Sequence, residues 1–347
     1  MGYLRVFLAI CVVLAHLDVN LLLSADHAVE TFFVISGFYM SFVLNERYVS
    51  SAQNLNFFKK RFIRLLPIYW ICCVVGLCLS YFLYKKGLST IFLFDIELFK
   101  KSTFDDYVFL IFSNLFALGE DVSMFLFWNN DISQIQFSLS SFSEQFPMAR
   151  FYCSPVAWSL GLELSFYLIA PFLLRRKMKT VLVVFCLSLL VKFIVRYYFG
   201  LNDGNWTYRF FPSELCCFCL GYFCYKIYKK IKACKARINK KIKYVLFLFL
   251  ICLSVYKSIY LLTFTLLQIY LVFSIPILFY LCKDDNIDRN IGNLSYIIYL
   301  VHPIVICCFS FNNSSVKPLI VILLTILVSL LLYIVIQRPI DRYRTCM

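Results

Sequence analysis

The chain has 347 residues, of which 62% are hydrophobic and only 15% are charged, and its mean hydropathy is +0.80. A soluble protein of this length needs far more polar surface, so the composition excludes a soluble enzyme and predicts a polytopic membrane protein. The net charge of +15 does not indicate a nucleic-acid partner. The basic residues lie in short runs between apolar segments, which is how the positive-inside rule distributes them.

Windows of about 20 apolar residues mark the candidate membrane spans. They predict an all-α polytopic membrane protein with about ten transmembrane helices, near residues 3–23, 28–45, 65–84, 156–174, 180–199, 210–226, 244–262, 263–282, 291–311 and 317–337. The strongest basic stretches, at 59–64, 175–179 and 226–243, then fall on the same side of the membrane. By the positive-inside rule this side is the cytoplasm, and we expect both termini to lie there.

Residues 107–127 are also apolar enough to enter the membrane, but a full crossing here would put the basic stretch at 175–179 on the wrong side. Gly119, Glu120 and Asp121 interrupt the segment as well. We therefore expect a re-entrant or interfacial pair of short helices, since irregular backbone is tolerated where protein buries it. Residues 1–347 are then expected to form a single transmembrane domain.

The first predicted span carries two ionisable residues, Arg5 and His16, with ten residues between them. An α-helix turns about 100° and rises about 1.5 Å per residue, so eleven positions make three turns plus roughly 20°. The two side chains then share one face, about 16 Å apart along the axis. Ionisable groups are costly in hydrocarbon, so this face is expected to line the protein interior and to be a candidate for chemistry.

The chain has 16 cysteines, and most of them lie in apolar runs, where they act as small buried hydrophobic residues. Cys216, Cys217, Cys219 and Cys224 form the densest group, and no His or carboxylate stands at metal-ligand spacing beside them. We therefore expect neither a metal site nor a disulfide framework.

Further motifs follow in order along the chain. They are Glu30-Thr31-Phe32-Phe33-Val34-Ile35-Ser36-Gly37, Lys60-Arg61-Phe62-Ile63-Arg64, Trp158-Ser159-Leu160-Gly161-Leu162-Glu163, Ser295-Tyr296, His302-Pro303 and Gln337-Arg338-Pro339. Together with Arg5 and His16, this order closely resembles the acyltransferase-3 family of integral-membrane O-acyltransferases. The resemblance covers essentially the whole chain.

The resemblance implies a domain of roughly ten spans, an acyl-CoA donor on the cytoplasmic side and usually an extracytoplasmic glycan acceptor. Some relatives carry a soluble hydrolase-like domain after the spans, and we expect none here, because the chain stops ten residues after the last span. Three departures stand out. The acidic residue often found upstream of Arg5 is missing, Glu30 stands where Asp is common, and Gln337 replaces the usual closing Glu.

His16 is the best candidate for a catalytic base. An imidazole, with an unperturbed pKa of about 6.5, can take a proton from a sugar hydroxyl as that hydroxyl attacks a thioester. The alternative is a neutral histidine that hydrogen-bonds between helices. For Arg5, a role on the donor phosphates or on the developing oxyanion competes with a snorkelling anchor at the membrane surface. Glu163 either pairs with His16 or Arg5 or forms a structural ion pair.

Lys60, Arg61 and Arg64 are candidates to bind the phosphates of coenzyme A. Arg at i and i+3 shares one helical face and can grip phosphate through paired donors, although a positive-inside anchor explains the same residues without a ligand.

The other motif residues have structural interpretations. Ser36 and Gly37 are expected to allow a close helix approach, and His302 to pack or position rather than to catalyse. Glu30, Trp158 and Ser159 are named only because they match the family motifs.

The sequence therefore predicts a membrane O-acyltransferase that moves acetyl, or a short acyl group, from acetyl-CoA to a hydroxyl of a cell-surface polysaccharide such as O-antigen, or of its lipid-linked precursor. Its expected location is the bacterial inner membrane, and its expected partners are acyl-CoA, the glycan and the bilayer, with no metal and no nucleic acid. Two alternatives remain open: a polysaccharide polymerase or lipid-linked glycan flippase, and a non-catalytic membrane scaffold on the same fold.

Overall fold

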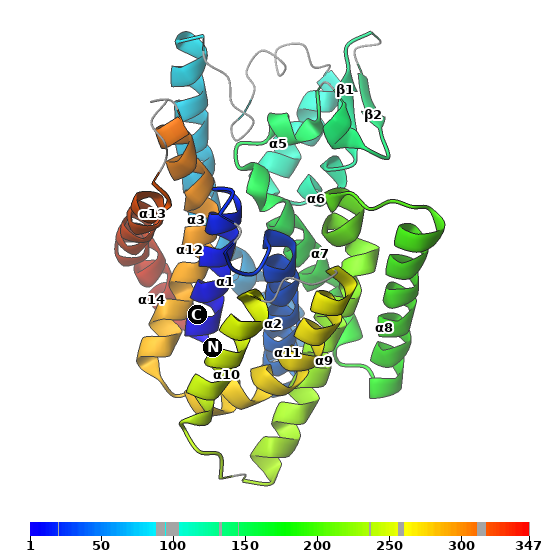
Figure 1. Ribbon diagram of the computed structural model, residues 1–347, viewed down its shortest axis with the longest axis vertical. Helices are drawn as coiled ribbons and strands as arrows, with labels where there is room; N and C mark the ends of the chain where they lie inside the picture. Colours follow the sequence, from blue (N-terminus) through cyan, green and yellow to red (C-terminus); the bar gives the residue numbers. More distant parts are fainter. Residues whose placement is uncertain are drawn as a thin grey trace. The chain divides into compact units, whose positions relative to one another are not determined.

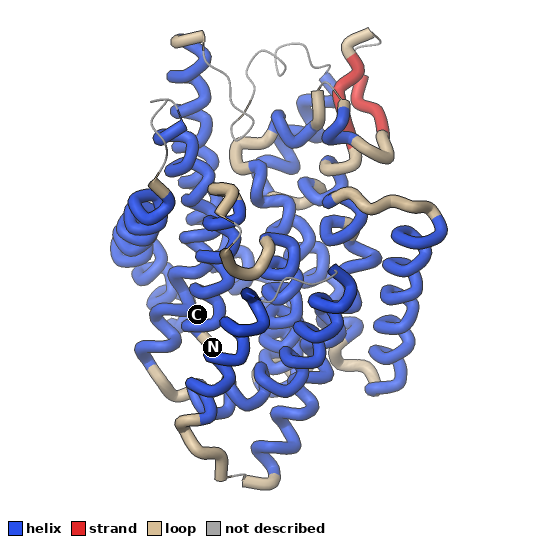
Figure 2. Tube along the Cα trace, viewed as in Figure 1, coloured by secondary structure: helices blue, strands red, loops and turns tan. Residues whose placement is uncertain are grey.

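The structure is a computed structural model that describes residues 1–19, 21–87, 94, 104–131, 134–144, 146–235, 237–255, 260–310 and 317–346. Helices make up most of these ranges, and β1 and β2 are the strands within them (Figures 1 and 2). Seven of the described helical segments are long and apolar enough to cross a membrane. The chain is therefore an all-α polytopic membrane protein, as its composition predicts.

A helix matches each predicted span. These helices are α1 (Gly2–Ala15), α2 (Ala25–Glu46), α3 (Asn54–Lys85), α7 (Trp158–Leu173), α8 (Met178–Phe193), α9 (Phe211–Ala233), α10 (Ile242–Val255), α11 (Tyr260–Cys282), α12 (Asn286–Ser310) and α13 (Pro318–Leu332).

The first helix is shorter than predicted. The apolar run suggests a helix to residue 23, but α1 ends at Ala15 and His16 is its C-terminal capping residue. The chain then turns, because Asp18 adopts a φ of 57° and its backbone N–H donates to the Ala15 carbonyl at 3.2 Å. Asp tolerates this left-handed conformation better than most residues. His16 therefore lies at the end of α1 and not within a long span.

The segment at 107–127 contains the predicted pair of short helices, α5 (Phe104–Phe116) and α6 (Glu120–Ser123). Gly119 separates them with a φ of 89°, a conformation that glycine adopts without strain. Their position in the membrane stays a prediction. The following strands were not predicted: β1 (Leu126–Asn129) pairs antiparallel with β2 (Gln134–Phe137), so that Trp128 lies opposite Ile135 (Figure 2).

The chain divides into two compact units, which are described separately. Unit 1 comprises Met1–Leu55, Ile169–Val191 and Glu214–Tyr299. Unit 2 comprises Asn56–Leu168, Lys192–Ser213 and Leu300–Met347.

In unit 1, α2 packs against α1 and α11. The contact of α2 with α9 needs two glycines, because a Cβ on Gly37 would lie 2.0 Å from the Phe218 carbonyl oxygen, and one on Gly221 would lie 2.3 Å from that of Val34. Small residues let membrane helices approach this closely. Beside this contact, aromatic side chains of α2, α9 and α11 stack edge to face; they are Phe38, Phe42, Tyr228 and Phe279.

Two of the predicted cytoplasmic stretches, 175–179 and 226–243, contact the end of α2 and the connection that follows it within unit 1. Arg175 donates to the Asn54 side chain at 2.8 Å and to the Tyr48 carbonyl at 2.5 Å, which joins the loop after α7 to the connection between α2 and α3. At the end of α2, Glu46 pairs with Lys232 of α9 at 3.5 Å. That all three basic stretches share one side of the membrane stays a prediction.

Unit 2 contains α3, α5, α6, the strands and most of α7. Short 3₁₀ turns connect the strands to α7: η2 (Ser141–Ser143), η3 (Met148–Phe151) and η4 (Pro155–Ala157). Trp128 of β1 is fully buried against Leu110, Met148 and Phe151. This core holds the loop region that precedes α7.

Unit 2 also contains the last described helices. A π-helical turn, η7 (Tyr333–Gln337), joins α13 to α14 (Arg338–Cys346), and two further π-helical turns are η5 (Ile194–Tyr198) and η6 (Asn205–Arg209). π-Helical turns are rare and often occur at functional sites.

Candidate active site

The predicted site residues fall into two groups. In unit 1 they are Arg5, His16, Glu30, Ser36 and Gly37. In unit 2 they are Lys60, Arg61, Arg64, Trp158, Ser159, Glu163 and His302.

Arg5 and His16 lie on α1, and both side chains are partly buried. The helix begins against α12, where a Cβ on Gly2 would overlap the Asp288 carbonyl oxygen at 1.6 Å. The Asp288 side chain accepts from the backbone N–H of Tyr3 at 3.2 Å. A carboxylate at a helix N-terminus stabilises the free N–H groups and the positive end of the dipole. Asp288 also forms an ion pair with the amino group of Met1, so a carboxylate of α12 holds the start of α1.

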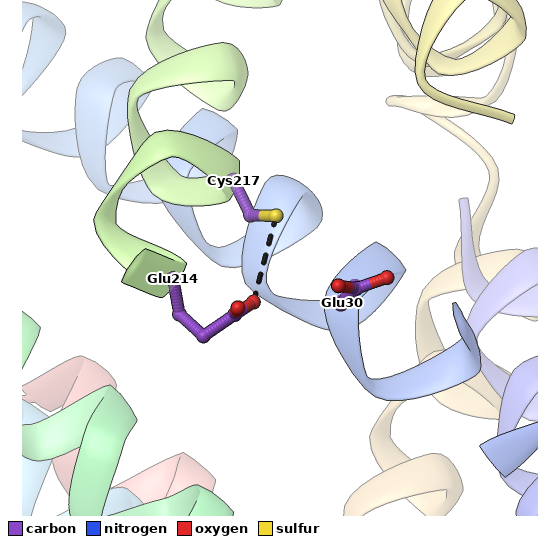
Figure 3. Close-up of side chains that lie close together, drawn as sticks. All are labelled: Glu30, Glu214 and Cys217. Atoms are coloured by element: carbon purple, nitrogen blue, oxygen red, sulfur yellow. Dashed lines mark hydrogen bonds between the residues drawn. The ribbon is translucent and has the colours of Figure 1, made fainter. Parts of the chain in front are cut away.

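Glu30 of α2 faces two side chains of α9, Glu214 and Cys217 (Figure 3). Their ligand atoms all lie within 4.8 Å of one another, and each side chain is almost completely buried. The Cys217 thiol donates to Oε2 of Glu214 at 3.7 Å. Two carboxylates and a thiol therefore lie together in the interior of unit 1.

The expectation that the cysteine group has no carboxylate partner was wrong for Cys217. Glu214 stands one helical turn before it, and Glu30 arrives from a distant part of the sequence. Among the described residues, these three are the ones that could hold a metal ion. A thiolate and two carboxylates are groups that can serve as ligands of Zn²⁺. The (i, i+3) spacing of Glu214 and Cys217 is the signal that sequence reasoning missed.

Gly37 lies at the contact between α2 and α9, and its close approach agrees with the predicted packing role, whereas that of Ser36 stays a prediction. The position of His27 near a span boundary predicts a solvated histidine, but the residue is only 3% exposed at the start of α2. Its Nδ1 lies 2.8 Å from the Ser24 hydroxyl and 3.2 Å from a carboxylate oxygen of Asp26. These local partners anchor the first turn of α2.

In unit 2, the Arg61 guanidinium lies over two neighbouring aromatic rings. Its Cζ is 5.6 Å from the ring centre of Phe57 and 5.9 Å from that of Tyr167, distances typical of cation–π contacts. The Tyr167 hydroxyl donates to Glu163, one turn earlier on α7. The charges of Arg64, Arg344 and Glu163 all act on Arg61. Two of the predicted phosphate-binding residues and the predicted carboxylate therefore belong to one cluster, which Lys60 adjoins on α3.

The end of the chain joins this cluster, which sequence reasoning did not anticipate. The Gln337 amide donates to the Arg64 carbonyl at 3.5 Å and to the Asp341 carboxylate at 3.3 Å. Asp341 in turn forms an ion pair with Arg344 at 2.9 Å. The charged spacing within α14 could have indicated a helix after the last span, but not its partner on α3.

Trp158 lies at the other end of α7, where it contacts Arg209. The Arg209 guanidinium is 5.0 Å from the Trp158 ring centre and donates to Asn205 at 2.9 Å. The Ser159 hydroxyl donates to the Val156 carbonyl at 3.3 Å, and His302 is fully buried in α12. The contacts of Trp158 and Ser159 hold the start of α7 in place, and they give no direct evidence of chemistry.

Another buried acid, Glu120, lies in α6. Glu120 is fully buried, and its Oε1 is 2.6 Å from the Tyr69 hydroxyl, which also lies 2.7 Å from the Asn114 carbonyl oxygen. A hydroxyl has one proton and cannot donate fully to both oxygens, so a protonated Glu120 that donates to Tyr69 satisfies the whole set. Burial raises the pKa of Glu120 well above its ordinary value, which agrees with this arrangement.

Comparison with known families identifies the chain. The sequence model of the acyltransferase-3 family, described as an acyltransferase domain, matches residues 1–338. No curated protein and no solved structure matched the chain in the same comparisons. The family match covers almost the whole length and agrees with the order of motifs in the spans. The chain therefore belongs to the acyltransferase-3 family and is a multi-pass membrane acyltransferase.

Proposed function

We propose that this acyltransferase moves an acetyl group from acetyl-CoA to a hydroxyl of a cell-surface polysaccharide, or of its lipid-linked precursor, in the bacterial inner membrane. The observation that carries the proposal is the cluster at the start of α3, where Arg61 and Arg64 lie beside Glu163 and Tyr167. Such a cluster suits an anionic donor at the predicted cytoplasmic end of a membrane helix.

The donor site follows from the chemistry of coenzyme A, whose nucleotide end carries several phosphate groups. Guanidinium groups bind phosphate through paired N–H donors and stay charged even when partly buried. Arg61 and Arg64 stand three residues apart on α3 and so share a helical face, with Lys60 adjacent. The rings of Phe57 and Tyr167 fix the guanidinium of Arg61 and reduce the entropy that binding would cost.

The acceptor chemistry is assigned to His16. Its imidazole takes the proton of the sugar hydroxyl while the hydroxyl oxygen attacks the thioester carbonyl carbon. The carbon–sulfur bond then breaks, and the imidazolium returns the proton to the departing thiolate. Arg5, on the same helix, supplies positive charge for the donor phosphates or for the oxyanion that forms on the carbonyl oxygen.

The proposed function is tested on the glycan itself. Surface polysaccharide from cells with and without the protein is compared by NMR for O-acetyl signals and by gel electrophoresis for chain length. We expect the O-acetyl signal to disappear without the protein while the chain length stays the same. Loss of long chains instead would indicate a polymerase or flippase, and unchanged glycan would indicate a non-catalytic scaffold.

A further inference from the structure

We propose that α14 completes the donor site, with Arg344 and Gln337 binding the nucleotide end of coenzyme A. The inference rests on the proposed function, because it concerns the same donor. It assigns binding roles to residues outside the predicted phosphate-binding motif, on a helix that follows the last span.

The first argument is the convergence of three guanidinium groups. Arg61 and Arg64 stand three residues apart on α3, and Arg344 of α14 is tied to them through Asp341 and through Gln337, which reaches the Arg64 backbone. Like charges that lie close together destabilise one another, and among the described residues of this cluster the carboxylates of Glu163 and Asp341 are fewer than the three guanidinium groups. A ligand with several negative charges relieves this repulsion, whereas a neutral ligand does not.

The second argument is the way the chain holds α14 against α3. Gln337, in the π-helical turn before α14, reaches the backbone of Arg64 and the side chain of Asp341 through one amide nitrogen. Asp341 then orients Arg344 through their ion pair at 2.9 Å. The chain from Arg64 through Gln337 and Asp341 to Arg344 fixes the third cation relative to the first two.

The third argument is the carbonyl oxygen of Gln337. The side chain is only 3% exposed, and its Oε1 has no hydrogen-bond partner among the residues that the structure describes. The amide orientation is fixed, since the other orientation would set Oε1 against two acceptors, the Arg64 carbonyl and the Asp341 carboxylate. A buried acceptor without a partner is costly, so the site calls for an N–H group.

The two requirements together describe the ligand. It must carry phosphates for the cations and an N–H donor for Gln337. Coenzyme A offers both, because its nucleotide bears phosphates and an adenine amino group, and its pantetheine arm bears amides. A lipid such as phosphatidylethanolamine offers similar chemistry, and the experiment is designed to separate the two sources.

The test uses the full-length protein in detergent, with acetyl-CoA as the donor and glycan from cells lacking the protein as the acceptor. The variants are Arg344→Gln and Gln337→Leu, and Arg342→Gln, on the same helix and exposed, is the matched control. We expect Arg344→Gln to raise the KM for acetyl-CoA about tenfold with little change in kcat, as suits the loss of a charged hydrogen bond. Gln337→Leu should raise the KM several-fold, and Arg344→Lys should restore part of the loss.

Competition identifies the part of the donor that is bound. Adenosine 3′,5′-bisphosphate should inhibit the wild-type protein and the Arg342→Gln control, and inhibit Arg344→Gln much more weakly. The same inhibition measurements are repeated with added phosphatidylethanolamine, and they show whether the site binds this lipid instead of the nucleotide. An unchanged KM for acetyl-CoA in Arg344→Gln would overturn the inference. It would also be overturned if Arg344→Gln changed only the response to phosphatidylethanolamine.

The outcomes separate this inference from the proposed function. If the wild-type protein transfers acetyl and Arg344→Gln behaves like it, only the role of α14 fails. If the wild-type protein neither binds coenzyme A nor transfers acetyl from it, the proposed function fails and the inference fails with it. Thermal unfolding of each variant shows whether the fold is intact. If Arg344→Gln does not fold, competition by the bisphosphate is measured on Arg344→Lys instead.

Discussion

The guanidinium of Arg61 lies 5.9 Å from the ring centre of Tyr167, and the hydroxyl of the same tyrosine donates to Glu163. Tyr167 also stacks edge to face on Phe57, with 6.5 Å between the ring centres. One aromatic side chain therefore contacts a cation through its face and a carboxylate through its hydroxyl. This relationship links the Lys60–Arg64 motif of α3 to the Trp158–Glu163 motif of α7.

Substitutions at Tyr167 should separate its two contacts. Tyr167→Phe keeps the ring and loses the hydroxyl, so it should leave the KM for acetyl-CoA within about threefold of wild type if the cation–π contact is what orients Arg61. Tyr167→Leu removes the ring and should raise the KM by about three- to tenfold, which corresponds to the roughly 0.5–1.5 kcal/mol of such a contact. Equal KM values for the two variants would contradict this role for the ring.

The glycine contact between α2 and α9 should not tolerate a side chain. In Gly37→Ala the new Cβ would lie 2.0 Å from a backbone oxygen of α9, which cannot move aside as a side chain can. We expect a loss of stability at or above the upper end of the roughly 1–3 kcal/mol typical of overpacking, with a low yield of folded protein in size-exclusion chromatography. Gly204→Ala is the control, since its Cβ would meet only the ring of Tyr208 at 3.1 Å. Equal yields of the two variants would contradict the packing argument.

Glu120 should make the stability of the protein depend on pH. Burial raises the pKa of Glu120 well above the value of about 4.3 of an exposed Glu, so the folded state favours the protonated form. The stabilisation is therefore fully present below about pH 4.3 and is lost as the pH rises through the higher pKa of the folded state.

Glu120→Gln should remove this loss of stability at high pH, because the glutamine amide carries no charge and can still donate to the Tyr69 hydroxyl. We expect its melting temperature in detergent to fall less than that of wild type between pH 5 and pH 9. Glu144→Gln, at a less buried glutamate that accepts from Ser138, serves as the control and should follow the wild-type profile. A melting temperature of Glu120→Gln that falls as much as that of wild type over this range would contradict this role for Glu120.

Apolar windows predict the spans well because hydrocarbon accepts only long apolar helices, and every predicted span has a helix in the structure. The residue at which a helix ends depends on local turns that a hydropathy window does not detect. The left-handed turn at Asp18, just after α1, is an example. The strands around Trp128 were missed for a related reason. Asn129, Asn130 and Asp131 are turn residues beside an alternating apolar pattern, and this signal was available in the sequence.

The candidate site was predictable only where its residues share a helix. Arg61 and Arg64 stand at (i, i+3), and that spacing alone places them on one face. The partners of Gln337 and Glu30 come from distant segments, and no local pattern records that Gln337 meets Arg64 or that Glu30 meets Glu214. Such contacts depend on the packing of the whole bundle, which the sequence of one helix does not contain.

The central claim, that His16 is the base of acyl transfer, is tested most directly by the rate at which purified His16→Ala transfers labelled acetyl from acetyl-CoA to the isolated glycan. The account predicts a fall of about 10²- to 10⁴-fold, the usual contribution of a general base, with a melting temperature close to wild type. Asp18→Asn, two residues later and exposed, is the matched control and should transfer at the wild-type rate. A folded His16→Ala protein that acetylates the glycan as fast as wild type would contradict the account.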